Sequence, residues 1–173
     1  SGGGFRPGGG TLGGVRFDEK DVLSLKKIDE VEYVVPYFVK TVRVQLEGES
    51  EITDVRGTTE DNFSISHFEV ELGEFFDAGD VKKRSKVAVL GAKIAETLFH
   101  SPELALGKTI RVENRGFKII GVLKKKGDIS HDSDSTVFMP YTSAFIFNPD
   151  KKFFDIHIQI KNYEEAEGVK QKI

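Results

Sequence analysis

The first regular pattern in the chain is helical. Residues 19–28, EKDVLSLKKI, carry Val22, Leu25 and Ile28 at a spacing that directs them toward one core. Asp18, immediately before this segment, is a residue type that caps helix N-termini well. The pattern predicts a short amphipathic helix that starts after Asp18.

A β-hairpin is predicted next. Apolar and polar residues alternate from 41 to 46, a turn follows at 47–50, and the chain returns through Ile52 and Val55. Pro36 has no N–H to donate to a neighbouring strand, so it marks a bend or an edge position. The alternation predicts a hairpin with one solvated face.

The middle of the chain mixes short helices with strands. DNFSISHFEVELGEFF, residues 61–76, suits a short turn followed by an extended stretch. KVAVLGAKIAETLF, residues 86–99, predicts a buried strand, a turn at Gly91 and a helix whose buried face includes Ile94 and Leu98. Residues 108–125 predict a second hairpin with its turn at Asn114-Arg115-Gly116.

The last third continues this mixture. It predicts a polar loop (GDISHDSDS, 127–135), a strand (TVFMPY, 136–141), a helical turn (TSAFIF, 142–147) and a strand (FFDIHIQI, 153–160). In that last strand Phe154, Ile156, Ile158 and Ile160 share one side. The sequence therefore predicts an α+β fold.

Gly107-Lys108-Thr109 matches the end of a nucleotide-binding P-loop, but the rest of that motif is absent. Pro102 stands where the first glycine of the motif would be, and it has no N–H to offer a phosphate. The residues after Thr109 predict a strand, whereas a phosphate would sit at a helix N-terminus. We interpret this segment as a loop that enters a hairpin.

Composition narrows the range of functions. The 173 residues are 38% hydrophobic, which is enough for one ordinary domain or two small subdomains. The net charge of -3 gives no basic field for nucleic acid. No apolar run is long enough to span a bilayer, and the absence of cysteine excludes disulfides and thiolate chemistry.

Both ends of the sequence look cut. Residues 1–17 are expected to form a flexible, Gly-rich lead-in, because they offer little apolar surface to offset the entropy of ordering. At the other end, residues 162–173 begin an amphipathic pattern with Tyr163, Ala166, Val169 and Ile173 near one face. The pattern stops without a cap, which is typical of an excised piece.

Candidate chemistry is sparse. His131, Asp132 and Asp134 could hold a divalent metal, although a solvated acidic loop explains them more simply. His67, His100 and His157 have no local partners for acid–base catalysis and are interpreted as surface histidines.

Two further candidates are weak. LKKKGD, residues 123–128, could contact an anionic partner, but a solvated strand end is the simpler interpretation. No serine lies in a G-x-S-x-G elbow. We assign no catalytic, cofactor-binding or metal residue.

Four motifs in a fixed order carry a family resemblance. They are VAVLG at 87–91, LGKTI at 106–110, FKIIGVL at 117–123 and VFMPY at 137–141. The helix near 21–28 and the VEYVVP that follows it belong to the same pattern. Residues 12–173 as a whole resemble the extracytoplasmic domain of MacB-type, FtsX-like ABC transporter permeases. Each motif is structural, and the specificity lies in their order.

The resemblance implies a division of the chain. It implies a membrane-proximal, porter-like subdomain of βαβ type that comprises residues 18–57 and 150–173. This subdomain is expected to be incomplete at its C-terminus. It also implies an inserted, membrane-distal subdomain of mixed β/α structure at residues 58–149.

The resemblance also implies a function. It suggests a non-catalytic domain that transmits ATP-driven motion to an exported substrate or an adaptor. The domain would lie on the outer side of the cell membrane, either in the periplasm or outside a cell with one membrane. The implied partners are a cytoplasmic ABC ATPase, a second permease copy and a membrane-fusion adaptor protein, without a cofactor. The alternative is a free-standing ligand- or metal-binding or small hydrolytic domain, for which the cluster around His131 is the only local hint.

Overall fold

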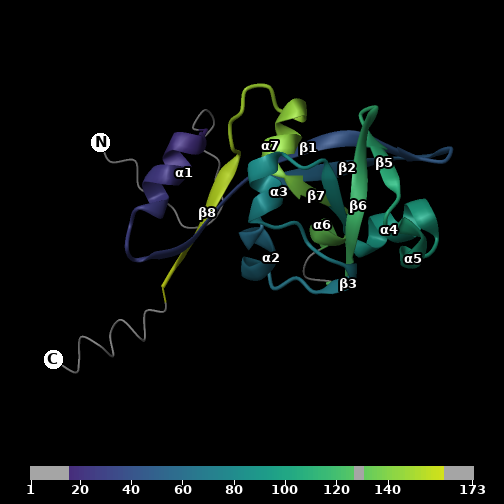
Figure 1. Ribbon diagram of the computed structural model, residues 1–173, viewed down its shortest axis with the longest axis horizontal. Coiled ribbons are helices and arrows are strands. Elements are labelled where there is room, and N and C mark those ends of the chain that lie inside the picture. Colours follow the sequence, from purple (N-terminus) through teal and green to yellow (C-terminus); the bar gives the residue numbers. More distant parts are fainter. Residues whose placement is uncertain (1–15, 127–130, 162–173) are drawn as a thin grey trace.

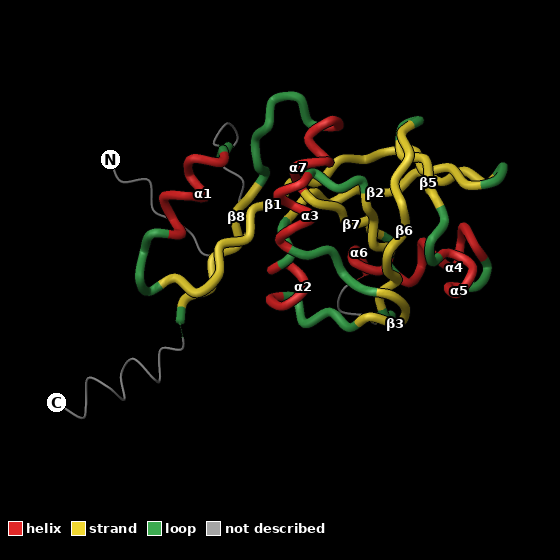
Figure 2. The backbone as a smooth tube through the Cα atoms, viewed as in Figure 1, coloured by secondary structure: helices red, strands yellow, loops and turns green. Residues whose placement is uncertain are grey.

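The computed structural model describes residues 16–126 and 131–161 and has an α+β fold (Figures 1 and 2). The helices are α1 (Glu19–Lys26), α2 (Asp61–Ile65), α3 (Ala78–Lys83), α4 (Ala92–Phe99), α5 (Pro102–Ala105), α6 (His131–Asp134), α7 (Tyr141–Ala144) and the 3-10 turn η1 (Phe145–Phe147). The strands are β1 (Val31–Leu46), β2 (Glu49–Thr58), β3 (Val70–Gly73), β4 (Val87–Leu90), β5 (Thr109–Val112), β6 (Arg115–Leu123), β7 (Thr136–Pro140) and β8 (Asp155–Ile160).

Six of the strands pair in a closed circuit. The order of pairing is β2-β7-β4-β6-β5-β1, and β1 pairs back to β2. The β2–β7 and β4–β6 pairs are parallel, and the other pairs in the circuit are antiparallel. A closed circuit leaves no free edge among these strands, so it forms a small barrel around an apolar interior.

The long strand β1 belongs to two ladders. Its first part, from Val31 to Tyr37, pairs with β8, and its second part, from Phe38 to Leu46, pairs with β2. Figure 1 shows α1 and β8 together at one end of the molecule and the barrel at the other, with β1 running between them. The two ends of the fold are therefore joined by one continuous strand.

The β1–β2 hairpin confirms its prediction. Val42, Val44 and Leu46 are buried at alternating positions of β1. The tight turn uses Glu47 and Gly48, both with positive φ (45° and 90°), which suits the twist of a two-residue hairpin loop. The alternation and the turn together fix the register, in which Leu46 faces Glu49.

Strand β4 and helix α4 also form where the sequence predicted them. Gly91 links them and caps α4, and the buried face of the helix carries Ile94, Ala95, Leu98 and Phe99. A Cβ at position 91 would lie only 2.3 Å from the carbonyl oxygen of Ser133. Glycine is needed at this position because the backbone of α6 passes so close.

Two local predictions were wrong in detail. The turn of the second hairpin lies at Glu113-Asn114, both with positive φ, and Arg115 already pairs with Val112. Ile28 was expected to face the core, but α1 ends at Lys26 and Ile28 is 45% exposed. In both cases the chain changes direction one to two residues earlier than the pattern suggests.

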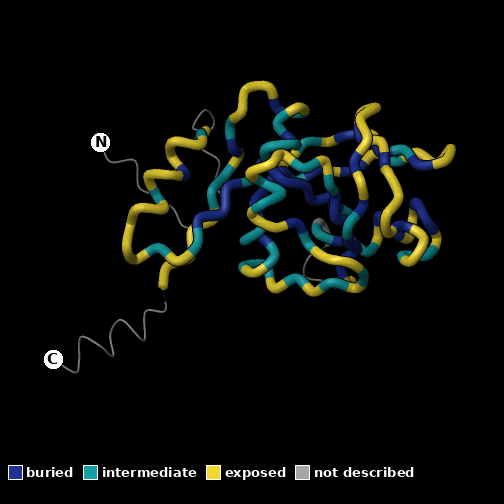
Figure 3. The backbone as a smooth tube through the Cα atoms, viewed as in Figure 1, coloured by how far each residue is buried: buried dark blue, intermediate teal, exposed yellow. Residues whose placement is uncertain are grey.

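The apolar core lies inside the barrel and extends to the base of α1 (Figure 3). A second, smaller cluster contains Phe76, Val89, Leu123 and Phe138. Phe75 and Phe76 stack with their ring centroids 4.4 Å apart. Phe75 is half-buried and packs against this cluster.

The division into a subdomain of residues 18–57 with 150–173 and an inserted subdomain of residues 58–149 stays a prediction. Residues 1–15 of the predicted lead-in, and the predicted amphipathic pattern at 162–173, lie outside the described residues. Phe17 is described, and it forms an antiparallel bridge with Phe153.

Candidate functional site

The Gly107-Lys108-Thr109 segment is a loop that enters a strand, as the sequence predicted. The Gly107 N–H donates to the carbonyl oxygen of Ile119 (2.8 Å), and Thr109 begins β5. The exposed ammonium of Lys108 lies 3.8 Å from the carboxylate of Glu47. The glycine N–H and the lysine are thus used within the fold, and no helix follows that could bind a phosphate.

The segment with His131, Asp132 and Asp134 differs from the expected solvated loop. Residues 131–134 form the short helix α6, and Asp134 is only 6% exposed. Its carboxylate accepts a hydrogen bond from the backbone N–H of Lys126 (3.0 Å), so it anchors the end of the segment that follows β6. The side chains of His131 and Asp132 lie outside the described residues. Within the described ranges, no group of three or more His, Asp or Glu side chains could hold a metal ion.

The other three histidines are exposed and lie on separate elements, which confirms their interpretation as surface residues. His100 directly follows α4 and His67 lies two residues after the end of α2, both in left-handed backbone (φ 62° and 54°). His157 faces solvent on β8, where it pairs with Val35 of β1. The structure brings none of them beside another.

The basic cluster at 123–128 makes internal contacts. The ammonium of Lys124 lies 3.6 Å from the carboxylate of Glu69, and that of Lys126 lies 4.8 Å from the centre of the Phe68 ring. Leu123 is buried at the end of β6. These contacts favour a solvated strand end over a docking site for an anionic partner.

The structure reveals an aromatic junction that the sequence did not predict, formed by Phe38, Tyr141, Phe145 and Phe153. Phe153 is fully buried, and its ring centroid lies 5.2 Å from Tyr141, 5.8 Å from Phe145 and 6.4 Å from Phe38. The Phe153 N–H also donates to the carbonyl oxygen of Phe17 (2.6 Å). Aromatic pairs at these distances add packing energy beyond the area that they bury. The junction thus joins β1, α7, η1 and the segment before β8.

Arg56 links three strands beside this junction. Its guanidinium carbon lies 4.8 Å from the ring centre of Tyr37 and 5.9 Å from that of Phe138, so β2 contacts both β1 and β7 through one side chain. The Tyr37 hydroxyl donates to the carboxylate of Asp155 on β8 (3.4 Å). Burial and the negative charge of Asp155 raise the pKa of Tyr37, against the opposing effect of Arg56.

Half-buried acidic groups lie around the junction. Burial raises the pKa of Tyr141 to about 12, with added contributions from the charge and hydrogen bond of Glu19 and from the charge of Glu60. Burial likewise raises the pKa of Glu60. In both groups burial disfavours the charged form.

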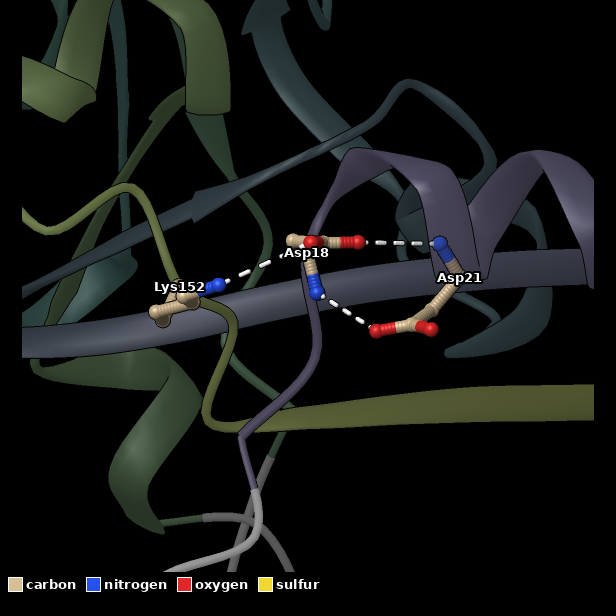
Figure 4. A network of polar contacts seen from close by, with 3 residues as sticks. All are labelled: Asp18, Asp21 and Lys152. Atoms are coloured by element: carbon tan, nitrogen blue, oxygen red, sulfur yellow. Dashed lines mark hydrogen bonds and ion pairs between the residues drawn. The ribbon is translucent and has the colours of Figure 1, made fainter.

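Helix α1 is tied to the same region through its N-terminus (Figure 4). The carboxylate of Asp18 accepts from the backbone N–H of Asp21 (3.1 Å), and that of Asp21 accepts from the N–H of Asp18 (2.8 Å). This is a reciprocal capping box. The ammonium of Lys152 lies 3.6 Å from the Asp18 carboxylate, and the backbone hydrogen bond from Asp21 is the main cause of a lowered pKa of Asp18.

No helix within residues 16–126 and 131–161 has the length and apolar character needed to cross a bilayer.

Two solved structures share this fold. The extracellular domain of the noncanonic ABC-type transporter YknZ from Gram-positive bacteria superposes with a TM-score of 0.75 at 22% identity, covering 88% of this chain and 78% of that one. The periplasmic region of MacB from Actinobacillus actinomycetemcomitans also gives a TM-score of 0.75, at 21% identity, and covers 90% of this chain and 72% of that one.

Sequence relatives are much longer proteins. The macrolide export ATP-binding/permease protein MacB of Marinobacter nauticus is 32% identical over 146 residues, which are 80% of this chain and 22% of that protein. The pyoverdine export ATP-binding/permease protein PvdT of Pseudomonas syringae pv. syringae is 31% identical over 130 residues, 73% of this chain and 20% of that protein. The chain spans about a fifth of the length of these relatives.

The family model described as the MacB-like periplasmic core domain matches residues 2–173. The match covers nearly the whole chain, and the fold agrees with it. The chain belongs to the MacB-like periplasmic core domain family.

Proposed function

We propose that this chain is the extracytoplasmic domain of an ABC transporter permease and that it transmits ATP-driven motion to an exported substrate or an adaptor protein. The observation that carries the proposal is the course of β1, which pairs with β8 in its first part and with the barrel strands β2 and β5 in its second. A displacement applied at the α1–β8 end would reach the barrel through an unbroken strand.

The contacts around β1 support stiff transmission. The aromatic junction packs against its middle, and the Thr58 hydroxyl donates to the carbonyl oxygen of Pro36 (2.9 Å) where β1 passes from one ladder to the other. A close-packed interior passes a displacement on, because packed elements move as rigid bodies. Such a role requires no catalytic residue in the domain.

The proposal includes partners outside this chain. ATP would be hydrolysed by a cytoplasmic ABC ATPase, and a second permease copy and a membrane-fusion adaptor would meet the domain on the outer side of the cell membrane. Both relatives described above are named as ATP-binding/permease proteins for export, which supports this assignment. Exposed apolar side chains at Phe154, Ile158 and Ile160 offer surface for such contacts.

The proposal can be tested in the full-length transporter without knowing its substrate. A spin label at Glu49→Cys, on the exposed hairpin tip, allows the distance between two copies to be measured with and without ATP by double electron–electron resonance. This fragment contains no cysteine of its own that would take up the label. We expect the distance to change between the nucleotide states.

Arg56→Met should reduce this change without lowering ATP hydrolysis, because it removes the guanidinium contacts with Tyr37 and Phe138 and retains an apolar stem. Arg43→Met is the matched control, since Arg43 is exposed on the same hairpin and contacts Ser50. An unchanged distance in both nucleotide states would refute the transmission role.

Sequencing the gene on both sides of this fragment is a simpler test. The proposal requires one apolar run long enough to span the membrane before it and three after it. Soluble sequence on both sides would contradict the permease assignment.

A further inference from the structure

A cavity of about 230 Å³ lies between α1, the end of α3, α7 with η1, and the turn that leads to β8. Its lining residues are Glu19, Arg84, Thr142, Phe145, Ile146 and Lys151. The volume is below the range typical of sites for drug-sized ligands, so the cavity suits a small molecule or one end of a larger one.

Two of the three charged residues that line the cavity are cations, Arg84 and Lys151. Neither Arg84 nor Lys151 forms an ion pair within the described ranges. The one lining carboxylate, Glu19, is engaged with the hydroxyl of Tyr141, whose pKa it helps to raise.

Both cationic residues have an unusual backbone conformation. Arg84 and Lys151 have left-handed conformations (φ 58° and 53°), which glycine or asparagine adopts more readily. Arg84 ends α3, at a position where glycine is common. Both side chains are exposed, so packing does not explain these residue types.

Hydrogen bonds hold the two turns in place. Ser85 donates its N–H to the carbonyl of Asp80 (2.9 Å) after α3. The buried Asn148 donates its side-chain amide to the carbonyl of Lys152 (2.8 Å), which fixes the loop that carries Lys151. Cations presented from fixed turns lose less entropy when a ligand binds.

The remaining wall is apolar. Phe145 and Ile146 line the side formed by η1, and Ile146 is 42% exposed although it is a large aliphatic residue. The Thr142 hydroxyl donates its hydrogen to the carbonyl of Val81 (2.6 Å), so among the lining side chains Arg84 and Lys151 are the donors left for an anion. Two cations facing an apolar wall match an anion that carries a short hydrocarbon group.

We propose that this cavity binds a carboxylate attached to a short apolar chain. The planar guanidinium of Arg84 donates two hydrogen bonds to the carboxylate, Lys151 adds a second positive charge, and Phe145 and Ile146 cover the hydrocarbon. A small carboxylic acid and the C-terminus of a peptide that ends in an apolar residue both present this chemistry.

The test is a titration of the ¹⁵N-labelled 173-residue chain with hexanoate at constant ionic strength, followed by amide chemical shifts. We expect saturable shifts at Arg84, Thr142, Phe145, Ile146 and Lys151. Hexanamide has the same chain without the charge and should cause none. A comparison of N-acetyl-leucine with N-acetyl-leucinamide then shows whether a peptide-like carboxylate is also accepted.

Arg84→Gly and Lys151→Gly should each weaken hexanoate binding by roughly tenfold or more, the effect of losing a charge-assisted hydrogen bond. Glycine suits the left-handed backbone, so both variants should stay folded with a Tm at or above that of the parent chain. Lys83→Ala removes a neighbouring charge that does not line the cavity and should leave binding unchanged. The proposal is overturned if no saturable shifts occur, if hexanamide binds as well as hexanoate, or if Arg84→Gly binds as tightly as the parent chain.

Discussion

The ring of Phe38 lies directly over the backbone of Gly57, so that a Cβ added to the glycine would come within 2.5 Å of the ring. The two residues are cross-strand partners in the β1–β2 ladder. The absence of a side chain at position 57 is what lets Phe38 reach the aromatic junction, where it stacks on Phe145 at 5.7 Å.

Gly57→Ala should therefore destabilise the domain by about 1–3 kcal/mol, the usual cost of overpacking. For a chain of this size, each kcal/mol lowers Tm by roughly 2–4 °C. Calorimetry checks the value, and Gly116→Ala is the control because its Cβ would meet only a methyl group of Thr109 at 3.1 Å. The effect should shrink when Phe38→Leu is present as well, since the shorter side chain leaves room. Part of the loss should remain, because the new methyl group would also lie 2.9 Å from the Cβ of Ala144. Equal losses in the two backgrounds would show that Phe38 is not the clashing group.

Phe153 and Phe154 provide a matched pair for testing the junction. Phe153 is fully buried among three aromatic rings, whereas its neighbour Phe154 is 56% exposed. Phe153→Ala should cost about 3–5 kcal/mol, as expected for a large buried aromatic residue. Phe154→Ala removes the same atoms from the next position and should change the stability by less than about 1 kcal/mol. Denaturant unfolding of both variants measures the difference, and similar losses would argue against the junction as the centre of packing.

These two phenylalanines also show how far the sequence could predict the fold. Alternation predicted a strand at 153–160, with Phe154, Ile156, Ile158 and Ile160 on one side, and the strand that forms is shorter, Asp155–Ile160. It could not show that Ile158 and Ile160 stay 40% and 56% exposed, or that Phe153 is the buried anchor. The partners of Phe153 come from positions 38, 141 and 145, and only the tertiary fold brings such distant positions together.

Local elements were more predictable than their pairing. The start of α1 at Asp18, the β1–β2 hairpin and the β4–α4 unit depend on caps, turns and periodicity within a few residues. The parallel pairing of β2 with β7, which closes the barrel, joins residues about eighty positions apart and leaves no local signal. The cavity with Arg84 and Lys151 was missed for the same reason, because its cations are brought together only by the fold.

Asp134 is predicted to stabilise the fold by holding the segment that follows β6. Asp134→Ala removes the acceptor for the Lys126 N–H and should cost about 1 kcal/mol, whereas Asp134→Asn keeps an oxygen in place and should cost less. Thermal unfolding of the two variants measures the contribution.

Adding EDTA should leave the Tm of the parent chain unchanged. A fall in Tm with EDTA would instead support the metal interpretation of the segment that contains His131 and Asp132.

Glu60 should make the stability of the domain depend on pH. Burial raises the pKa of its carboxyl group, and the negative charges of Asp61 and Asp77 add to this against the opposing charge of Lys26. Between its pKa in the unfolded chain, about 4.3, and its higher pKa in the folded chain, the folded state holds a proton that the unfolded state has lost. The contribution of Glu60 to stability therefore falls as pH rises through this interval, and the loss is complete above it.

Glu60→Gln removes this titration and should raise Tm at pH 7 relative to the parent chain, with the gain disappearing below about pH 4. Glu96→Gln is the matched control, because it removes the same charge from an exposed position on α4 and should give no such gain. Scanning calorimetry from pH 3 to pH 8 compares the three proteins. A gain in Tm confined to the upper part of the pH range identifies the buried charge of Glu60 as the cause. A gain in Tm of equal size at every pH would mean that Glu60 acts through packing or hydrogen bonding.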